Sequence, residues 1–222
     1  MLKAAAIAAA TERSSQPAAG PDGGPDVYHW LINGGRGDAF DRHLFACTVT
    51  IVAAGAKAGD TPSLSDATGL GRDALAALFA AYFPHALALL EGIPASAAPV
   101  EDAIEEPDLR QLLLDHRTHG TRAEAWLAAI VARRSLGPNH LWQDLGLNDR
   151  SELGRLLHRH FAPLASENVH DMKWKKFFYR RLCQLDGVLV CKAPNCEVCT
   201  DKAVCFGDEN GEPLARARRS VL

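Results

Sequence analysis

Apolar residues recur along this chain at the spacing of a helix face, and no stretch alternates apolar and polar residues as a half-buried strand does. The helices predicted from this pattern span about residues 39–56, 65–69, 72–92, 108–118, 122–135, 149–164 and 171–185. Pro84 is expected to kink or break the third helix, because proline removes an amide donor and clashes with the preceding turn. The sequence therefore predicts an all-α fold with an irregular, cysteine-rich metal-cluster loop near its C-terminal end.

Two stretches depart from the helical pattern and divide the chain. Residues 1–26 are rich in Ala, Ser, Gly and Pro, so we expect a disordered leader with little to bury. Residues 93–108 contain three prolines and five acids and predict a solvated linker inside a helical domain that spans residues 27–186. Residues 187–222 then form the cysteine-rich cluster loop and a polar tail.

Neither a targeting segment nor a membrane span is expected. The first ten residues, MLKAAAIAAA, lack the strong apolar core and cleavage site of a secretory signal. No stretch approaches the ~20 apolar residues of a membrane span. The net charge of −3 gives no global indication of nucleic acid or membrane as a partner. We therefore expect a cytoplasmic protein, in which clustered cysteines indicate metal or redox chemistry before disulfides.

Four of the six cysteines lie within fifteen residues, in the stretch CKAPNCEVCTDKAVCFG. They follow the spacing C-x4-C-x2-C-x5-C and are Cys191, Cys196, Cys199 and Cys205. Structural zinc sites usually separate two cysteine pairs by ~12 or more residues, whereas C-x4-C-x2-C also occurs in ferredoxins. The spacing favours an iron–sulfur cluster over zinc, although a cluster that only staples the C-terminal region would use the same ligands. Cys47 is expected to be a buried, inert thiol, and Cys183 either a buried thiol or a further ligand.

The helix predicted before the cysteines has an apolar stripe and a basic face. The basic residues at positions i, i+3 and i+7 are Lys173, Lys176 and Arg180, and Lys175 and Arg181 extend the positive charge. This face is either the solvated side of an ordinary amphipathic helix or a surface beside the cluster. In the second case it would attract a small oxyanion or the acidic surface of a partner protein.

Three histidines lie where a cluster ligand or a core residue could stand. His140 precedes a helix and His170 precedes the basic helix, so either could face the cluster. His160 lies on an apolar helix face and is expected to pack in the core. The Gly-x-Ser-x-Gly elbow, the P-loop and the HExxH motif are all absent from the sequence.

Three stretches of this sequence resemble the NifQ family. They are NHLWQDLGL (139–147), MKWKKFFYRRLC (172–183) and the cysteine stretch that ends in CFG (190–207), in which Val190 stands where the family has leucine. The resemblance implies a cytoplasmic protein of nitrogen fixation that is a carrier and not an enzyme. Such a protein holds an iron–sulfur cluster of the 4Fe-4S or MoFe3S4 type and donates molybdenum, received as molybdate, for assembly of the iron–molybdenum cofactor of nitrogenase.

The resemblance also implies partners and ligands. The partners are a cofactor-assembly scaffold complex and the nitrogenase iron protein. Carried over residue by residue, the cluster ligands are Cys191, Cys196, Cys199 and Cys205, and the family pattern leaves the roles of Cys183, His140 and His170 open. Lys173, Lys176 and Arg180 are expected either to guide molybdate or to dock the protein on its acceptor.

Two other functions fit part of the pattern. Helix-hairpin-helix DNA glycosylases are also all-α and end in four closely spaced cysteines that hold a structural [4Fe-4S] cluster. Against this, the chain has no glycine-rich hairpin and is acidic overall, whereas DNA-binding proteins usually present a strong basic surface. A zinc-stapled interaction module is the third alternative, and it would be colourless where an iron–sulfur protein is brown.

Overall fold

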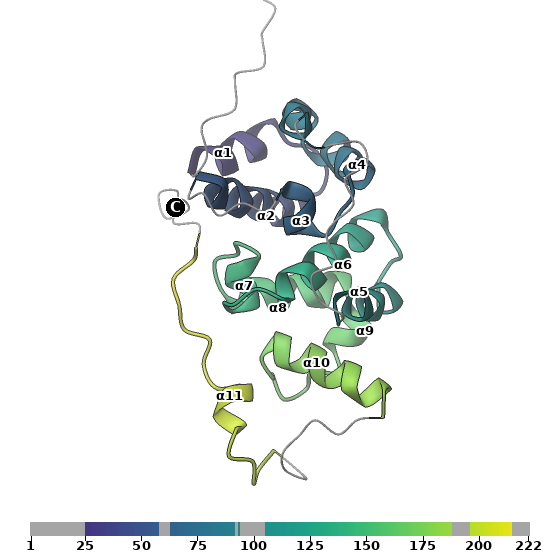
Figure 1. The fold of residues 1–222 in the computed structure, drawn as a ribbon, viewed down its shortest axis with the longest axis vertical. Helices are drawn as coiled ribbons and strands as arrows, with labels where there is room; N and C mark the ends of the chain where they lie inside the picture. The colour runs from purple at the N-terminus through teal and green to yellow at the C-terminus, as the bar shows by residue number, and fades with distance from the viewer. Residues whose placement is uncertain (1–24, 58–62, 92, 94–104, 188–195, 215–222) are drawn as a thin grey trace, which may run out of the picture.

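The computed structural model describes residues 25–57, 63–91, 93, 105–187 and 196–214, and within these ranges its regular secondary structure is entirely helical (Figure 1). The helices are α1 (Pro25–Gly34), α2 (Ala39–Lys57), α3 (Leu64–Thr68), α4 (Arg72–Tyr82), the 3-10 helix η1 (Pro84–Leu90), α5 (Glu105–Asp115), α6 (Arg122–Ser135), α7 (Leu141–Asp144), α8 (Arg150–His160), α9 (Ala162–Ala165), α10 (Trp174–Leu185) and α11 (Lys202–Phe206). The all-α prediction is confirmed for the described residues. None of these helices is both long enough and apolar enough to cross a membrane.

Most of the predicted helices form within a few residues of their expected bounds, and the capping residues explain why. Asp38 accepts hydrogen bonds from the amides of Phe40 and Asp41 at the start of α2, at 2.9 and 3.0 Å. Asp149 accepts one from the amide of Glu152 at the start of α8, at 2.9 Å. The third predicted helix breaks at Pro84, as expected, into α4 and η1.

The predicted linker needs one correction. Residues 105–108 belong to α5, which therefore begins three residues before its predicted start. Glu106 is buried, because it pairs with Arg110 one helical turn later and lies 3.2 Å from Arg133 of α6. A carboxylate that is paired with two guanidinium groups can be buried. Residues 94–104 of the predicted linker and residues 1–24 of the predicted leader lie outside the described residues.

The helices are arranged in three tiers along the long axis of the molecule (Figure 1). Helices α1 to α4 and η1 form one end, α5 to α9 the middle, and α10 and α11 the other end. At the centre, α6 packs against α3, α4, α5 and α7. It buries Trp126, Ile130 and Val131, as the sequence predicts. The middle tier thus separates the N-terminal helices from the cysteine-bearing end.

Helix α10 is attached to the middle tier by its apolar face. Trp174, Phe177 and Phe178 are buried, and Leu182 packs partly buried beside them. This is the stripe predicted from the sequence, although the helix begins at Trp174, three residues later than expected. Burial of three aromatic rings fixes which face of α10 turns outward, and that face carries Lys176 and Arg180.

Candidate metal centre

Three of the four clustered cysteines lie in the described residues, on the segment that contains α11. Cys196 and Cys199 lie in turns, Cys205 lies in α11, and all three are free and partly exposed thiols. The amide of Lys202 donates to the carbonyl of Cys199 at 3.2 Å, which closes the turn between the second and third of these cysteines. The predicted irregular loop thus includes one short helix. Cys191 lies outside the described residues.

The cysteine segment is attached to α10 at two points. The backbone amide of Lys173, just before α10, donates to the carbonyl of Cys205 at 2.8 Å. An Arg180 guanidinium nitrogen lies 3.7 Å from Cys196 Sγ and donates to it.

The basic face of α10 divides into residues with and without carboxylate partners. Lys175 Nζ donates to the carbonyls of Gly137 and Asn139 and to Asp144 Oδ2, at 2.6, 2.7 and 2.6 Å. Arg181 pairs with Glu167 at 2.8 Å. By contrast, no carboxylate pairs with any residue of the predicted i, i+3, i+7 set within the described part of the chain. That set is Lys173, Lys176 and Arg180.

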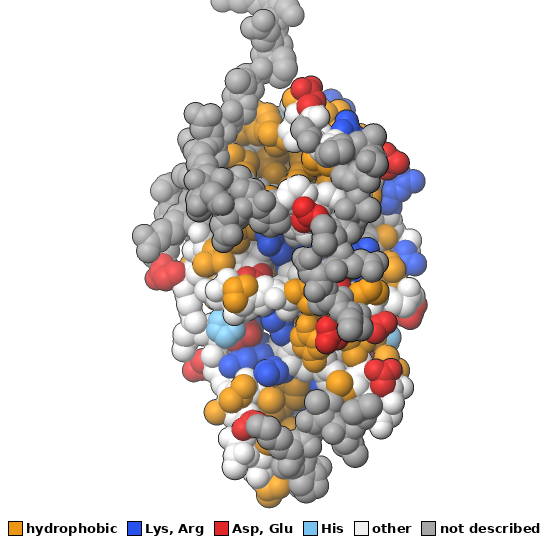
Figure 2. Space-filling model, viewed as in Figure 1, with side chains coloured by type: hydrophobic (Ala, Val, Ile, Leu, Met, Phe, Trp, Pro, Cys, Tyr) orange, Lys and Arg blue, Asp and Glu red, His pale blue; other side chains and the backbone are white. Residues whose placement is uncertain are grey.

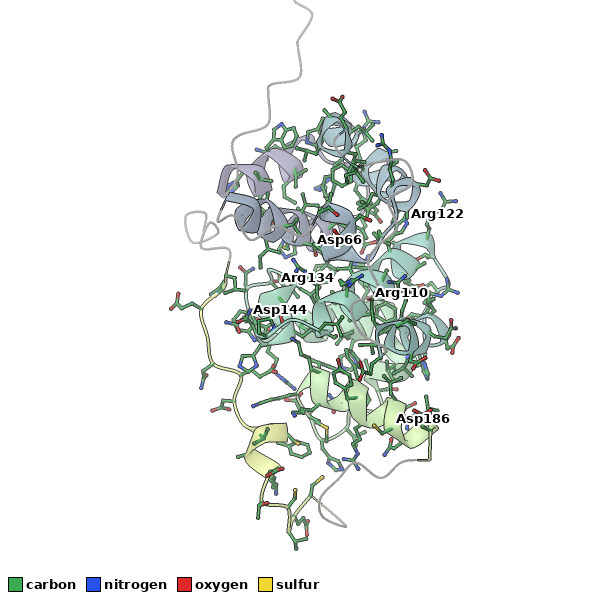
Figure 3. All side chains as sticks on the ribbon, in the orientation of Figure 1. Asp66, Arg110, Arg122, Arg134, Asp144 and Asp186 are labelled. Atoms are coloured by element: carbon green, nitrogen blue, oxygen red, sulfur yellow. The ribbon has the colours of Figure 1, made fainter. Side chains whose placement is uncertain are left out.

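The three stretches that carry the family resemblance lie together in space. Lys175 joins the second stretch to the first, because two of its three acceptors belong to Asn139 and Asp144. The bond between Lys173 and Cys205 joins the second stretch to the third. Figure 3 places Asp144 on α7, and Figure 2 shows Lys and Arg side chains on the surface between α7 and α11.

The described thiols do not by themselves form a closed ligand set. Among the residues that the structure describes, no three His, Cys, Asp or Glu side chains come close enough together to hold one metal ion. The fourth predicted ligand, Cys191, is not among those residues. The four-cysteine site therefore stays a prediction.

Comparison with known proteins decides the family. A family model described as NifQ matches residues 44–207. The chain belongs to the NifQ family. It is 42% identical over 177 residues to "Protein NifQ homolog" of Sinorhizobium fredii (strain NBRC 101917 / NGR234), covering 78% of this chain and 74% of that protein. It is 50% identical over 105 residues to "Protein NifQ" of Azotobacter vinelandii, covering 47% of this chain and 54% of that protein. No solved structure matches.

Membership in the NifQ family points to a role in nitrogen fixation, through iron–molybdenum cofactor biosynthesis, as the sequence resemblance implies. It favours that role over the DNA-repair alternative. The matched region includes the whole of the described cysteine segment up to Gly207 and all of α10.

The remaining predicted site residues of this NifQ-family chain have different surroundings. His160 is buried 3.1 Å from Asp41, and Cys47 is fully buried, so both are core residues as predicted. His140 is the N-cap residue of α7, and its Nδ1 lies 3.3 Å from Glu209 Oε1. His170 is exposed, and Cys183 is a partly exposed thiol on α10. A ligand role for His140, His170 or Cys183 stays a prediction.

Four residues of the site were not singled out from the sequence. Gln143 and Asp144 belong to the first NifQ-like stretch, which is the signal that could have found them. Arg150 and Glu209 lie 59 positions apart and contact each other at 2.6 Å. Nothing in the local pattern around either residue indicates that long-range contact.

Proposed function

We propose that this protein carries a molybdenum–iron–sulfur cluster on Cys191, Cys196, Cys199 and Cys205 and donates molybdenum for assembly of the iron–molybdenum cofactor. The observation that carries the proposal is the segment with three free, partly exposed thiols attached to α10, where a guanidinium group contacts Cys196 Sγ. The acceptors are a cofactor-assembly scaffold complex and the nitrogenase iron protein.

The donor set fits a cluster of iron and reduced molybdenum. Thiolates are soft ligands and suit such a cluster better than carboxylate or carbonyl oxygens do. The thiols are partly exposed. The segment around α11, which carries them, lies at one end of the molecule (Figure 1). A cargo held there can be reached by a partner without unfolding of the core, since exposed terminal segments open at low free-energy cost.

Three basic residues in and just before α10 supply the second part of the proposal. Molybdate is an oxyanion, and Lys176, Lys173 and Arg180 have no carboxylate partner among the described residues. A cation without a partner attracts an oxyanion more strongly than one already neutralised by a carboxylate. These residues guide molybdate to the thiols.

The cluster is tested by metal analysis of the full chain purified without air. We expect about three to four iron atoms per chain, with less than one molybdenum, for one cubane-type cluster. Replacement of Cys196, Cys199 or Cys205 by Ser, one at a time, should remove most of the iron, whereas Cys47→Ala should retain it. Zinc alone in the wild-type protein, or full iron in all three Ser variants, would overturn the proposal.

The basic face is tested by charge reversal. The double variant Lys173→Glu, Lys176→Glu should lower molybdenum loading several-fold, on the order of the steering effect of a local charge patch, while iron content stays normal. Arg122→Glu is the matched control, because Arg122 is exposed and lies far from α11 (Figure 3). If molybdenum loading and transfer are both normal in the double variant, these lysines do not guide molybdate.

A further inference from the structure

The chain beyond α11 is seated on the middle tier of the molecule. Figure 1 shows it running from α11 alongside α7. Gln143 Nε2 of α7 donates to the carbonyl of Glu212 at 2.9 Å. A Cβ added to Gly211 would lie 2.5 Å from the same nitrogen, so a glycine at this position permits the close approach. We call residues 205–214 the strap, which consists of the last two residues of α11 and the chain after it.

The charged side chain of Glu209 attaches the strap to the middle tier. Its side chain is only 6% exposed, although the residues around it in sequence are polar. Arg150 donates to Oε2 at 2.6 Å, and His140 Nδ1 lies 3.3 Å from Oε1. A carboxylate removed from water in this way is held firmly only where cations or donors replace its hydration.

Arg150 connects the strap to the start of α10. Its NH2 group donates to Asp171 Oδ1 at 2.7 Å and to the carbonyls of Asp171 and Met172, each at 3.0 Å. Asp171 has a φ of 52°, a left-handed conformation that non-glycine residues adopt at some cost. Asn168 holds this turn, because its side chain bonds both the amide and the carbonyl of Met172. The turn thus presents its acceptors to Arg150.

We propose that Glu209 is a positioning residue for the cysteine segment and acts through Arg150. The carbonyl of Cys205 accepts a hydrogen bond from the Lys173 amide, and Glu209 fixes the chain to Arg150 four residues later. Detachment of Glu209 leaves the strap with the Lys173 and Gln143 contacts and the apolar packing of Cys205 and Phe206. The attachment of Glu209 therefore controls how readily Cys205 moves away from α10. An effect of this attachment on cluster release rests on the proposed function.

The attachment is tested first on the reduced, metal-free chain, where the proposed function plays no part. In Glu209→Gln, amide hydrogen exchange over 202–214 and alkylation of Cys205 by iodoacetamide should both accelerate about tenfold relative to wild type. Glu209→Asp, which keeps the charge on a shorter side chain, should fall in between. Glu167→Gln is the matched control, because it removes an exposed ion pair with Arg181 of α10 away from the strap.

The second measurement uses anaerobically purified, iron-loaded protein. Glu209→Gln should start with the wild-type iron content and lose iron to a chelator several-fold faster than wild type and Glu167→Gln. Exchange and alkylation rates in Glu209→Gln equal to those of Glu167→Gln would overturn the inference. An iron-free wild type would instead overturn the proposed function and leave the exchange result standing.

Discussion

Two adjacent lysines on α10 show how differently neighbouring residues of one type are used. The Lys175 ammonium group has three oxygen acceptors, and one of them, Asp144, has a side chain only 7% exposed. Lys176 is exposed and has no acceptor among the described residues. Lys175 therefore fixes α10 to the turn before α7, and Lys176 is free for a ligand.

This difference predicts opposite effects on stability. Lys175→Met should lower the free energy of unfolding by about 3 kcal/mol, because it removes the cation that contacts the buried Asp144 carboxylate. Lys176→Met should change it by less than about 0.5 kcal/mol. Urea unfolding of the reduced, metal-free variants measures both. Equal effects would mean that the Lys175 contacts contribute no net stability, and adding Asp144→Asn to Lys175→Met should recover part of the loss.

At the scale of elements, the sequence predicts helices wherever the apolar spacing is long. Helices α2 and α6 match their predicted bounds nearly to the residue, because each combines a capping side chain with a buried face. The single helix predicted over 149–164 is wrong at its end, because the chain breaks at Phe161, before Pro163, into α8 and α9. The sequence does not predict the short α1, since Val27 and Leu31 are the only buried residues among its described side chains and it follows a run of Pro and Gly. The early start of α5 was also missed, because the pairing of Glu106 with Arg133 is a contact between two helices.

In the candidate site, too, the sequence predicts local patterns but not contacts between residues that are distant in the chain. The clustered cysteines and the basic helix are local patterns, so the sequence reveals them. Which basic residues are already paired is decided by partners 31 to 38 positions away, as for Lys175. Glu209 depends in the same way on Arg150. Only a folded structure can show such pairings, because no periodicity links the partners.

At the scale of the whole molecule, one buried polar group joins the N-terminal tier to the middle tier. Asp41 of α2 accepts a hydrogen bond from the Tyr82 hydroxyl at the end of α4, at 3.2 Å. The same carboxylate lies 3.1 Å from His160 and 3.7 Å from Arg159, both at the end of α8. The pKa of Tyr82 is raised well above its usual value of 10.0. Burial is the larger cause, and the negative charge of Asp41 adds to it.

The raised pKa of Tyr82 predicts how stability falls in alkali. Because the folded state keeps this hydroxyl protonated, its contribution is fully present below the unfolded pKa of about 10 and is lost as pH rises above it. In Tyr82→Phe that loss is absent. Urea unfolding at about pH 8 and about pH 11 measures the free energy of unfolding of wild type and of Tyr82→Phe. Between these pH values wild type should lose stability relative to the variant, by up to about 1.4 kcal/mol per pH unit above 10.

Ionisation of the other tyrosines and of the lysines is common to both proteins and cancels in the comparison. A difference that stays constant between the two pH values would show that the Tyr82 hydroxyl ionises as readily in the folded chain as in the unfolded one.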